Sequence, residues 1–245
     1  MAQLPIYHTN NMGRKSNIVR QHTFRDILED IRNSANATKQ QKLPHYYIIT
    51  EGQTEKWYLI HLRNADRLKF TFPDPISVNG GDYLTKIAEE IDKQSAIPRS
   101  KIICIFDVDR FHNSQAEFVN YQKFVEKYKV VNIFNNMPSV EYWFLLHFMS
   151  KPISKFFSKT ELLGELTKFK PFENKSEQEL KSDTFLAQVN WFNVLCGNSF
   201  VNLTKAINFA KIIARTTSNN RMDKVKAPTG CTVSYSDMYK LFDLN

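Results

Sequence analysis

A chain of 245 residues with 42% hydrophobic residues has the length and composition of one large globular domain, or of one domain with an appendage. It contains no run of about 18 apolar residues and no apolar signal-peptide core, which argues against a membrane span, a membrane partner or a secreted form. Three cysteines without metal-ligand spacing indicate reduced thiols and a cytoplasmic location, and the net charge of +8 favours nucleic acid as a partner over an ordinary solvated surface.

The first part of the chain is expected to be a basic arm. Residues 1–22 show no clear periodicity, 23–31 have the apolar spacing of a short amphipathic helix, and a polar linker follows. We therefore predict an amino-terminal arm with a short helix over residues 1–44.

From residue 45 onward the pattern alternates between strands and helices. Strands are expected at 45–50, 75–78, 100–106 and 130–134, and helices at 54–68, 79–94 and 115–128. Alternation of elements of this length predicts an α/β fold in which helices flank a parallel sheet, over residues 45–150.

After residue 138 the pattern becomes helical. A helix is expected at 139–148, further helices with polar breaks continue to about residue 215, and 172–183 begins one of them. A short amphipathic helix is expected at 236–244. We predict that residues 151–245 form a mostly helical part that packs on the α/β core.

The most informative segment is an apolar run that ends in two carboxylates, Asp107 and Asp109. Alternation along a strand directs residues i and i+2 to one face, so the two acids can converge just past the end of the strand. Ligands of open α/β sheets bind in that crevice, and paired carboxylates attract a hard divalent cation such as Mg²⁺. The alternative is structural, with Asp107 capping the next helix and Asp109 solvated.

Two further acids follow strands of the same predicted sheet. Glu51 stands at a Glu-Gly turn and would lie beside Asp107 and Asp109 if the two strands are neighbours, so that three carboxylates supply oxygen ligands for Mg²⁺. Glu141, in the first turn of the helix at 139–148, is a fourth acid that could serve a second metal. The alternative for Glu51 is a carboxylate favoured by a helix dipole.

Four segments together resemble the RloB family, a group with a Toprim-type fold found in bacterial phage-defence and restriction-modification loci. They are Glu51-Gly52 with Thr54-Glu55, Gly80-Gly81, Asp107-Val108-Asp109, and Asn136 to Phe148, whose Trp-Phe-Leu-Leu-His-Phe element is the most specific. The resemblance covers residues 45–150 well and the carboxy-terminal helices loosely. The sequence departs from the family pattern at Thr50 and Arg110, neither of which is a proposed metal ligand.

By similarity the chain would be a Mg²⁺-dependent nuclease of antiphage defence, with Mn²⁺ as the alternative metal. Metal held by Glu51, Asp107 and Asp109 would neutralise phosphate charge and activate a water or leaving oxygen. Glu141 would complete a second metal site, and Glu55 would support the ligands or act as a base. RNA, and transfer RNA in particular, is slightly favoured over DNA because related Toprim defence effectors attack it. A defence-system partner such as an ATPase is a further expectation.

Basic side chains are expected to hold the nucleic-acid backbone. These are Lys56 and His147 near the acids, and Lys211, Arg215, Arg221, Lys224 and Lys226 in the carboxy-terminal part. His147 has a second interpretation, as a histidine that packs in the core.

Two other functions stay open. One is a non-catalytic nucleic-acid-binding or sensor subunit of a defence complex, against which the set of four acids argues. The other is a phosphoryl-transfer enzyme acting on nucleotides, against which the absence of a Walker-type glycine-rich motif argues.

Overall fold

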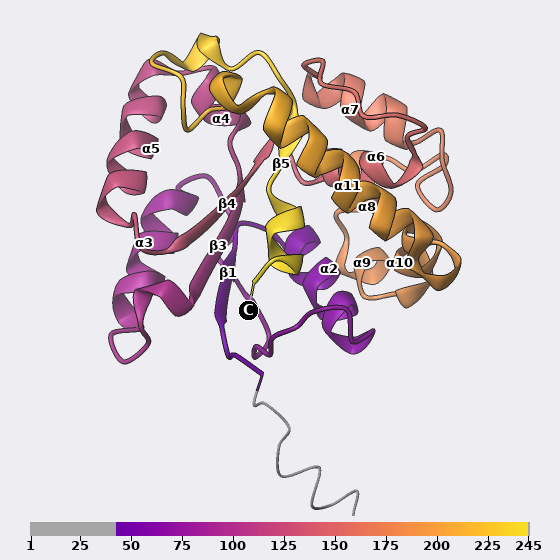
Figure 1. Cartoon of the computed structure of the whole chain (residues 1–245), viewed down its shortest axis with the longest axis horizontal. Coiled ribbons are helices and arrows are strands. Elements are labelled where there is room, and N and C mark those ends of the chain that lie inside the picture. Colours follow the sequence, from indigo (N-terminus) through magenta and orange to yellow (C-terminus); the bar gives the residue numbers. More distant parts are fainter. Residues whose placement is uncertain (1–42, 245) are drawn as a thin grey trace, which may run out of the picture. The chain divides into compact units, whose positions relative to one another are not determined.

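A five-stranded sheet in the order β2-β1-β3-β4-β5 forms the centre of residues 43–244, which are the residues that the computed structural model describes (Figure 1). The predicted helix at 23–31 and nearly all of the predicted arm lie outside them. The strands are β1 (Tyr47–Thr50), β2 (Ile76–Ser77), β3 (Ile102–Asp107), β4 (Asn132–Met137) and β5 (Tyr235–Ser236). β1 to β4 are parallel and β5 is antiparallel to β4.

Helices cover both faces of this sheet, and α3 and α5 lie on the face opposite to α2, α6 and α11 (Figure 1). The longer helices are α2 (Gln53–Asn64), α3 (Tyr83–Lys93), α5 (Gln115–Lys127), α6 (Glu141–Phe148), α7 (Lys159–Leu166), α10 (Val189–Cys196) and α11 (Val201–Thr216). Single turns form α4 (Asp109–His112), α8 (Glu177–Leu180) and α9 (Asp183–Leu186). The expected class, an α/β fold with a mostly parallel sheet and a helical carboxy-terminal part, is confirmed.

β3 is the central strand, and its apolar run from 102 to 106 is fully buried. Helices cover both faces of the sheet, so side chains on either face of β3 are buried. The strand is therefore apolar throughout and does not alternate between apolar and polar residues. In the register of the sheet Thr50 lies beside Ile105, and Asp107 lies beside Asn136. The carboxyl ends of β1, β3 and β4 therefore meet at one edge.

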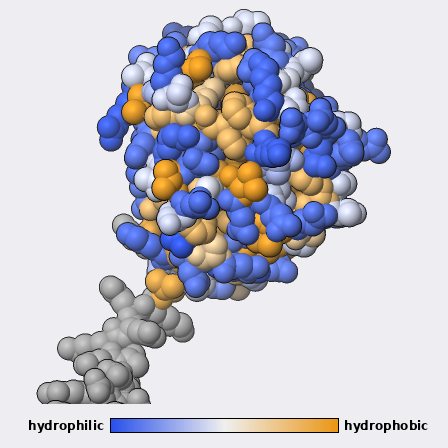
Figure 2. Space-filling model, turned by 90° about the vertical axis from the view of Figure 1, so that its right-hand side faces the viewer, coloured by the Kyte–Doolittle hydropathy of each residue, from blue (hydrophilic) through white to orange (hydrophobic). Residues whose placement is uncertain are grey.

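The carboxy-terminal helices join the sheet part through a cluster of aromatic side chains. Trp191 of α10 lies with its ring centroid 5.5 Å from that of Phe144 in α6 and 6.4 Å from that of Tyr58 in α2. All three side chains are buried. Through this cluster α10 packs on α2 and α6. Figure 2 shows the face that these helices form, where hydrophilic surface predominates and apolar spots are scattered.

Two elements at the β4–β5 edge of the sheet differ from the prediction. The amphipathic helix expected at 236–244 is instead the strand β5 followed by a 3-10 helix, Met238–Phe242. β4 extends to Met137, which pairs with Tyr235. Both differences arise because a strand is stabilised here by a partner about a hundred residues away, which local periodicity does not record. No helix in the described range is long and apolar enough to cross a membrane.

Candidate functional site

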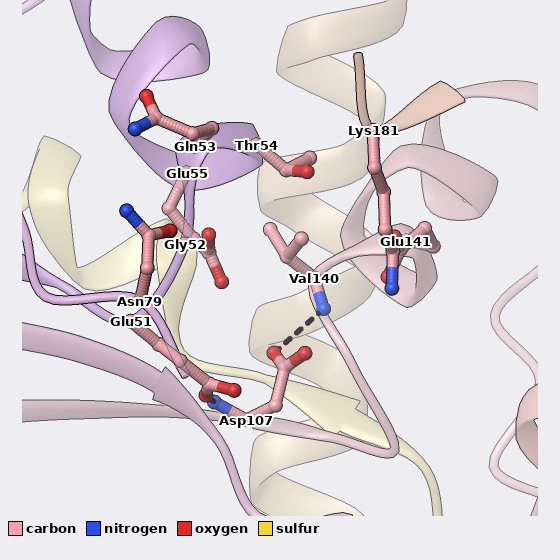
Figure 3. A pocket seen from close by; sticks show the side chains of 10 residues that line it. All are labelled: Glu51, Gly52, Gln53, Thr54, Glu55, Asn79, Asp107, Val140, Glu141 and Lys181. Carbon is pink, nitrogen blue, oxygen red and sulfur yellow. Dashed lines mark hydrogen bonds between the residues drawn. The ribbon is translucent and has the colours of Figure 1, made fainter. Parts of the chain in front are cut away.

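A pocket of about 190 Å³ lies at the carboxyl ends of β1 and β3 (Figure 3). Four acidic side chains and one cationic side chain line it: Glu51, Glu55, Asp107, Glu141 and Lys181. The remaining lining residues are Gly52, Gln53, Thr54, Asn79 and Val140. The acids come from the end of β1, the first turn of α2, the end of β3 and the start of α6.

Two hydrogen bonds hold Glu51 and Asp107 in place. The N–H of Asp107 donates to Oε2 of Glu51 at 2.9 Å, which ties the turn after β1 to the end of β3. Oδ1 of Asp107 in turn accepts from the N–H of Val140 at 2.9 Å, immediately before α6 (Figure 3). Asp107 therefore fixes the position at which α6 begins, and with it the first residue of that helix, Glu141.

Glu55 turns back toward the amino-terminal end of α2, where Gly52 makes room for it. A Cβ at Gly52 would lie 3.1 Å from Oε2 of Glu55, a contact too tight unless the carboxyl group shifts. Glu55 is buried, with 3% of its surface exposed. Gly52 therefore does more than form the turn after β1: because it has no side chain, the carboxyl group of Glu55 can lie against it.

Four acids here hold their protons more tightly than free carboxyl groups do: Glu51, Glu55, Asp107 and Asp109. Burial raises the pKa of Glu51 to about 7, although the N–H that it accepts from Asp107 opposes the shift. Burial and the neighbouring charge of Glu51 raise the pKa of Glu55 to about 8. The same two causes raise the pKa of Asp107 well above its ordinary value, and burial raises the pKa of Asp109. The positive charge near these carboxyl groups is too small to offset their burial and their mutual repulsion. A bound cation would therefore stabilise their ionised forms.

The donor chemistry of the site fits a hard divalent cation, since all four acids offer carboxylate oxygen. Their present placement is looser than a coordination sphere. Within residues 43–244 no three His, Cys, Asp or Glu side chains surround one point closely enough to hold a metal ion. A shared ion would therefore require rotation of these side chains within the pocket.

Asp109 does not converge with Asp107 in the way that strand alternation predicted. β3 ends at Asp107, and Asp109 is the first residue of α4, where its Oδ1 accepts from the N–H of Arg110 at 2.8 Å. It is not among the residues that line the pocket, but its charge contributes to the raised pKa of Glu51. The change from strand to helix after Asp107 removes the common face.

Two of the predicted phosphate contacts are structural residues instead. His147 is fully buried, its Nδ1 lies 2.9 Å from the carbonyl oxygen of Trp143, and burial lowers its pKa to about 3. Arg221 is 6% exposed, and its guanidinium donates to Asp237 at 2.7 Å. Neither can reach a ligand in this conformation, so the packing interpretation of His147 is the one that the structure supports.

The other predicted basic contacts lie at the surface. Lys56 is half-buried on α2, next to the pocket residue Glu55. Lys211 pairs with Asp243 at 2.6 Å, and Arg215, Lys224 and Lys226 are exposed. None of these side chains lines the pocket.

Lys181, a cation that lines the pocket, was not among the predicted site residues. It follows the short helix α8 and reaches the acids only because the carboxy-terminal helices pack on the sheet part. The sequence predicts only that residues 172–183 begin a helix, because no local spacing marks a lysine whose partners lie in other elements.

The fold and the site define an α/β protein with an acidic pocket at the carboxyl edge of a mostly parallel sheet. The family model of RloB-like proteins matches residues 46–243, and the chain belongs to this family. The match includes the carboxy-terminal helices, where the resemblance in the sequence was loose. Neither the comparison with curated proteins nor the comparison with solved structures found a match.

Proposed function

We propose that this protein is a metal-dependent nuclease of Toprim type that hydrolyses phosphodiester bonds in nucleic acid during antiphage defence. The observation that carries the proposal is the convergence of Glu51, Asp107 and Glu141, from separate elements, on one pocket with few compensating charges. A buried group of like charges is costly to the fold unless a cation or a cationic ligand joins it, and hence such groups mark functional sites.

The residues have distinct parts in this proposal. Glu51, Asp107 and Glu141 would hold Mg²⁺ or Mn²⁺ through carboxylate oxygens, with Asp109 reaching the ion by side-chain rotation. When bound, the metal supplies charge stabilisation on phosphate oxygens and a water of lowered pKa. Glu55, which lines the same pocket as Glu51, would accept or return a proton at the pocket wall, and its pKa of about 8, near neutral pH, supports this part.

The favoured substrate is RNA, with transfer RNA first, and the site of action is the cytoplasm. The net charge of +8 supports a polyanionic substrate. An ATPase of the same defence system is the partner that we propose.

A second candidate function is a non-catalytic nucleic-acid-binding or sensor subunit. The observation that favours it is the spread of the acids, since no three of them in the described part of the chain surround one point. Such a protein would bind nucleic acid beside the pocket without cutting it.

The test is cleavage by the purified full chain of labelled transfer RNA, single-stranded RNA and supercoiled plasmid, with Mg²⁺, Mn²⁺ or EDTA. Asp107→Asn is the variant, because asparagine keeps an oxygen for the Val140 N–H. Glu126→Gln is the control, because Glu126 is 81% exposed at the surface. Metal-dependent cutting that Asp107→Asn loses and Glu126→Gln keeps supports the nuclease. Binding without cutting by the folded wild-type protein favours the sensor.

A further inference from the structure

Two lysine side chains share one carboxylate oxygen beside the acidic pocket. Nζ of Lys181 lies 2.8 Å from Oε1 of Glu177, and Nζ of Lys159 lies 3.4 Å from the same atom. Lys159 is the first residue of α7, Glu177 is the first residue of α8, and Lys181 directly follows α8. We refer to Lys159 and Lys181 as the lysine pair.

The lysine pair faces the acids of the pocket. Lys181 lines the pocket, and Figure 3 shows its amino group beside the carboxyl group of Glu141. Burial acts to lower the pKa of Lys181, but the charge of Glu141 and the hydrogen bond to Glu177 outweigh it and raise the pKa. The charge of Lys159 acts on Glu51 and Asp109 and offsets part of the rise in pKa that burial causes in both carboxyl groups. Lys181 therefore belongs to the pocket wall, and Lys159 lies next to it because both ammonium groups contact the same oxygen of Glu177.

The lysine pair carries more charge than Glu177 needs. One ammonium group would neutralise this carboxylate, whereas two on the same oxygen repel each other and leave a net positive charge. Each ammonium group has three N–H donors, and Glu177 occupies one of each, so others are free for a ligand. Both lysine side chains are 40% exposed, which leaves them accessible from the solvent.

We propose that Lys159 and Lys181 form the phosphate-binding subsite of the pocket. They contact the non-bridging oxygens of the nucleic-acid phosphate that lies against Glu51, Asp107 and Glu141, and Glu177 holds the two ammonium groups in place. The acids alone would repel a phosphate, so the positive groups beside them account for how a polyanion enters this pocket. The inference rests on the proposed nuclease function and names the residues that hold its substrate.

A purely internal role for the lysine pair makes a different prediction. If the two lysines only neutralise the acids, removing them lowers the stability of the metal-free protein and Mg²⁺ restores it, while the affinity for nucleic acid stays unchanged. Affinity and its salt dependence therefore separate the two roles.

The experiment measures binding of a short labelled single-stranded RNA and of its DNA counterpart to the full chain by fluorescence anisotropy, over a series of salt concentrations. Ca²⁺ replaces Mg²⁺ so that strands stay intact, and a parallel series contains EDTA. The variants are Lys159→Gln, Lys181→Gln, the double variant and Lys181→Arg. Lys168→Gln is the matched control, since Lys168 pairs with Glu165 at 2.8 Å in the same helical part and is 61% exposed.

We expect each glutamine variant to weaken binding by about tenfold, because a charge-assisted hydrogen bond to phosphate is removed. The slope of log affinity against log salt should fall by about 0.7 for each lost phosphate contact on a single strand. Lys181→Arg should retain most of the affinity, and Lys168→Gln should match the wild type in affinity and slope. RNA bound more tightly than DNA would assign the strand type.

Unchanged affinity and slope in the folded double variant overturn the inference, and a loss of stability that Mg²⁺ restores then assigns the lysines as counterions. Failure of the wild-type protein to bind either strand also overturns it. The nuclease proposal is tested separately, by the cleavage assay in Mg²⁺. If the wild type binds through the lysine pair but cuts nothing, the phosphate subsite stands and the protein is a binder. If it cuts while the lysine variants bind normally, the nuclease stands without this subsite.

Discussion

The carboxyl group of Asp107 accepts a hydrogen bond and is also ionisable, and the two properties can be separated. Its Oδ1 holds the start of α6 through the N–H of Val140, at 2.9 Å. Burial and the charge of Glu51 raise its pKa, so its ionised form is disfavoured where it stands. In this one residue, a hydrogen bond that positions α6 is combined with a carboxyl group whose ionisation is unfavourable.

Asp107→Asn and Asp107→Ala should therefore differ in stability but not in activity. Asparagine keeps an acceptor for Val140 and removes the disfavoured charge, so the metal-free variant should melt at or above the wild-type temperature. Alanine leaves the Val140 N–H unpaired and should cost about 1–3 kcal/mol. Both should lose metal-dependent cleavage. Thermal melting in EDTA checks the first two statements, and equal melting of the two variants would contradict them.

His147→Leu should leave nucleic-acid affinity at the wild-type value. The histidine is fully buried and neutral, and its ring packs against Trp143 with centroids 5.1 Å apart. A leucine removes the buried polar nitrogens and keeps an apolar side chain at this position. Anisotropy binding beside Lys181→Gln provides the comparison. A loss as large as that of the lysine variant would show that His147 reaches the ligand after all.

The elements were predictable where the pattern is local and unpredictable where the partner is distant. β1, β3, α5 and the acids Glu51, Asp107 and Glu141 follow from apolar runs, helix spacing and the position of a residue just past a strand. β5 could not be predicted, because two residues of strand exist only through their pairing with β4. The place of Lys181 in the pocket depends likewise on how α8 packs, and the helical start at Asp109 displaced that acid from the expected face.

The aromatic junction of α2, α6 and α10 should make the sheet and the carboxy-terminal helices unfold together. Trp191 is 2% exposed, and its indole N–H donates to the carbonyl oxygen of Leu186 at 2.9 Å. Trp191→Ala should cost about 3–5 kcal/mol through the cavity that it leaves. Val194→Ala on the same helix is the control, because Val194 is 46% exposed.

Urea unfolding followed by tryptophan fluorescence and by circular dichroism tests this statement. A single transition that shifts to lower urea in Trp191→Ala and stays in place in Val194→Ala is expected. Two separate transitions in the wild type would show that the helices form an independent unit.

For the described unit as a whole, the acidic pocket sets how stability depends on pH. The pKa of Glu51 rises from 4.5 in a free carboxyl group to about 7, and that of Glu55 rises from 4.5 to about 8. The folded state therefore binds protons that the unfolded chain has released, and the resulting stabilisation is lost as pH rises toward 8. His147, with a pKa lowered from 6.5 to about 3, is neutral in the folded state, whereas the unfolded imidazole goes on losing protons until about one pH unit above 6.5, so this group opposes part of the loss at the lower end of the range.

Without metal, the melting temperature should thus fall between pH 6.5 and pH 8, and Mg²⁺ should raise it more at pH 8 than at pH 6.5, since it binds the ionised carboxylates. Differential scanning fluorimetry in EDTA and in Mg²⁺ measures both effects. Replacing Glu51 and Glu55 together by glutamine should flatten the profile. A flat wild-type profile in EDTA would mean that these carboxyl groups are not held protonated.

The pairing of β5 with β4 has a consequence for the order in which the chain is made. Ser236 donates to Asn136 at 2.7 Å across a sequence separation of 100 residues, and Asn136 lies beside Asp107 in the sheet. On the ribosome, the edge strand that buttresses the acids is absent until long after the acids themselves have been translated. A nascent chain thus carries every acidic group of the site before the sheet beside them is complete, and the pairing of β4 with β5 forms only after residues 235–237 have emerged.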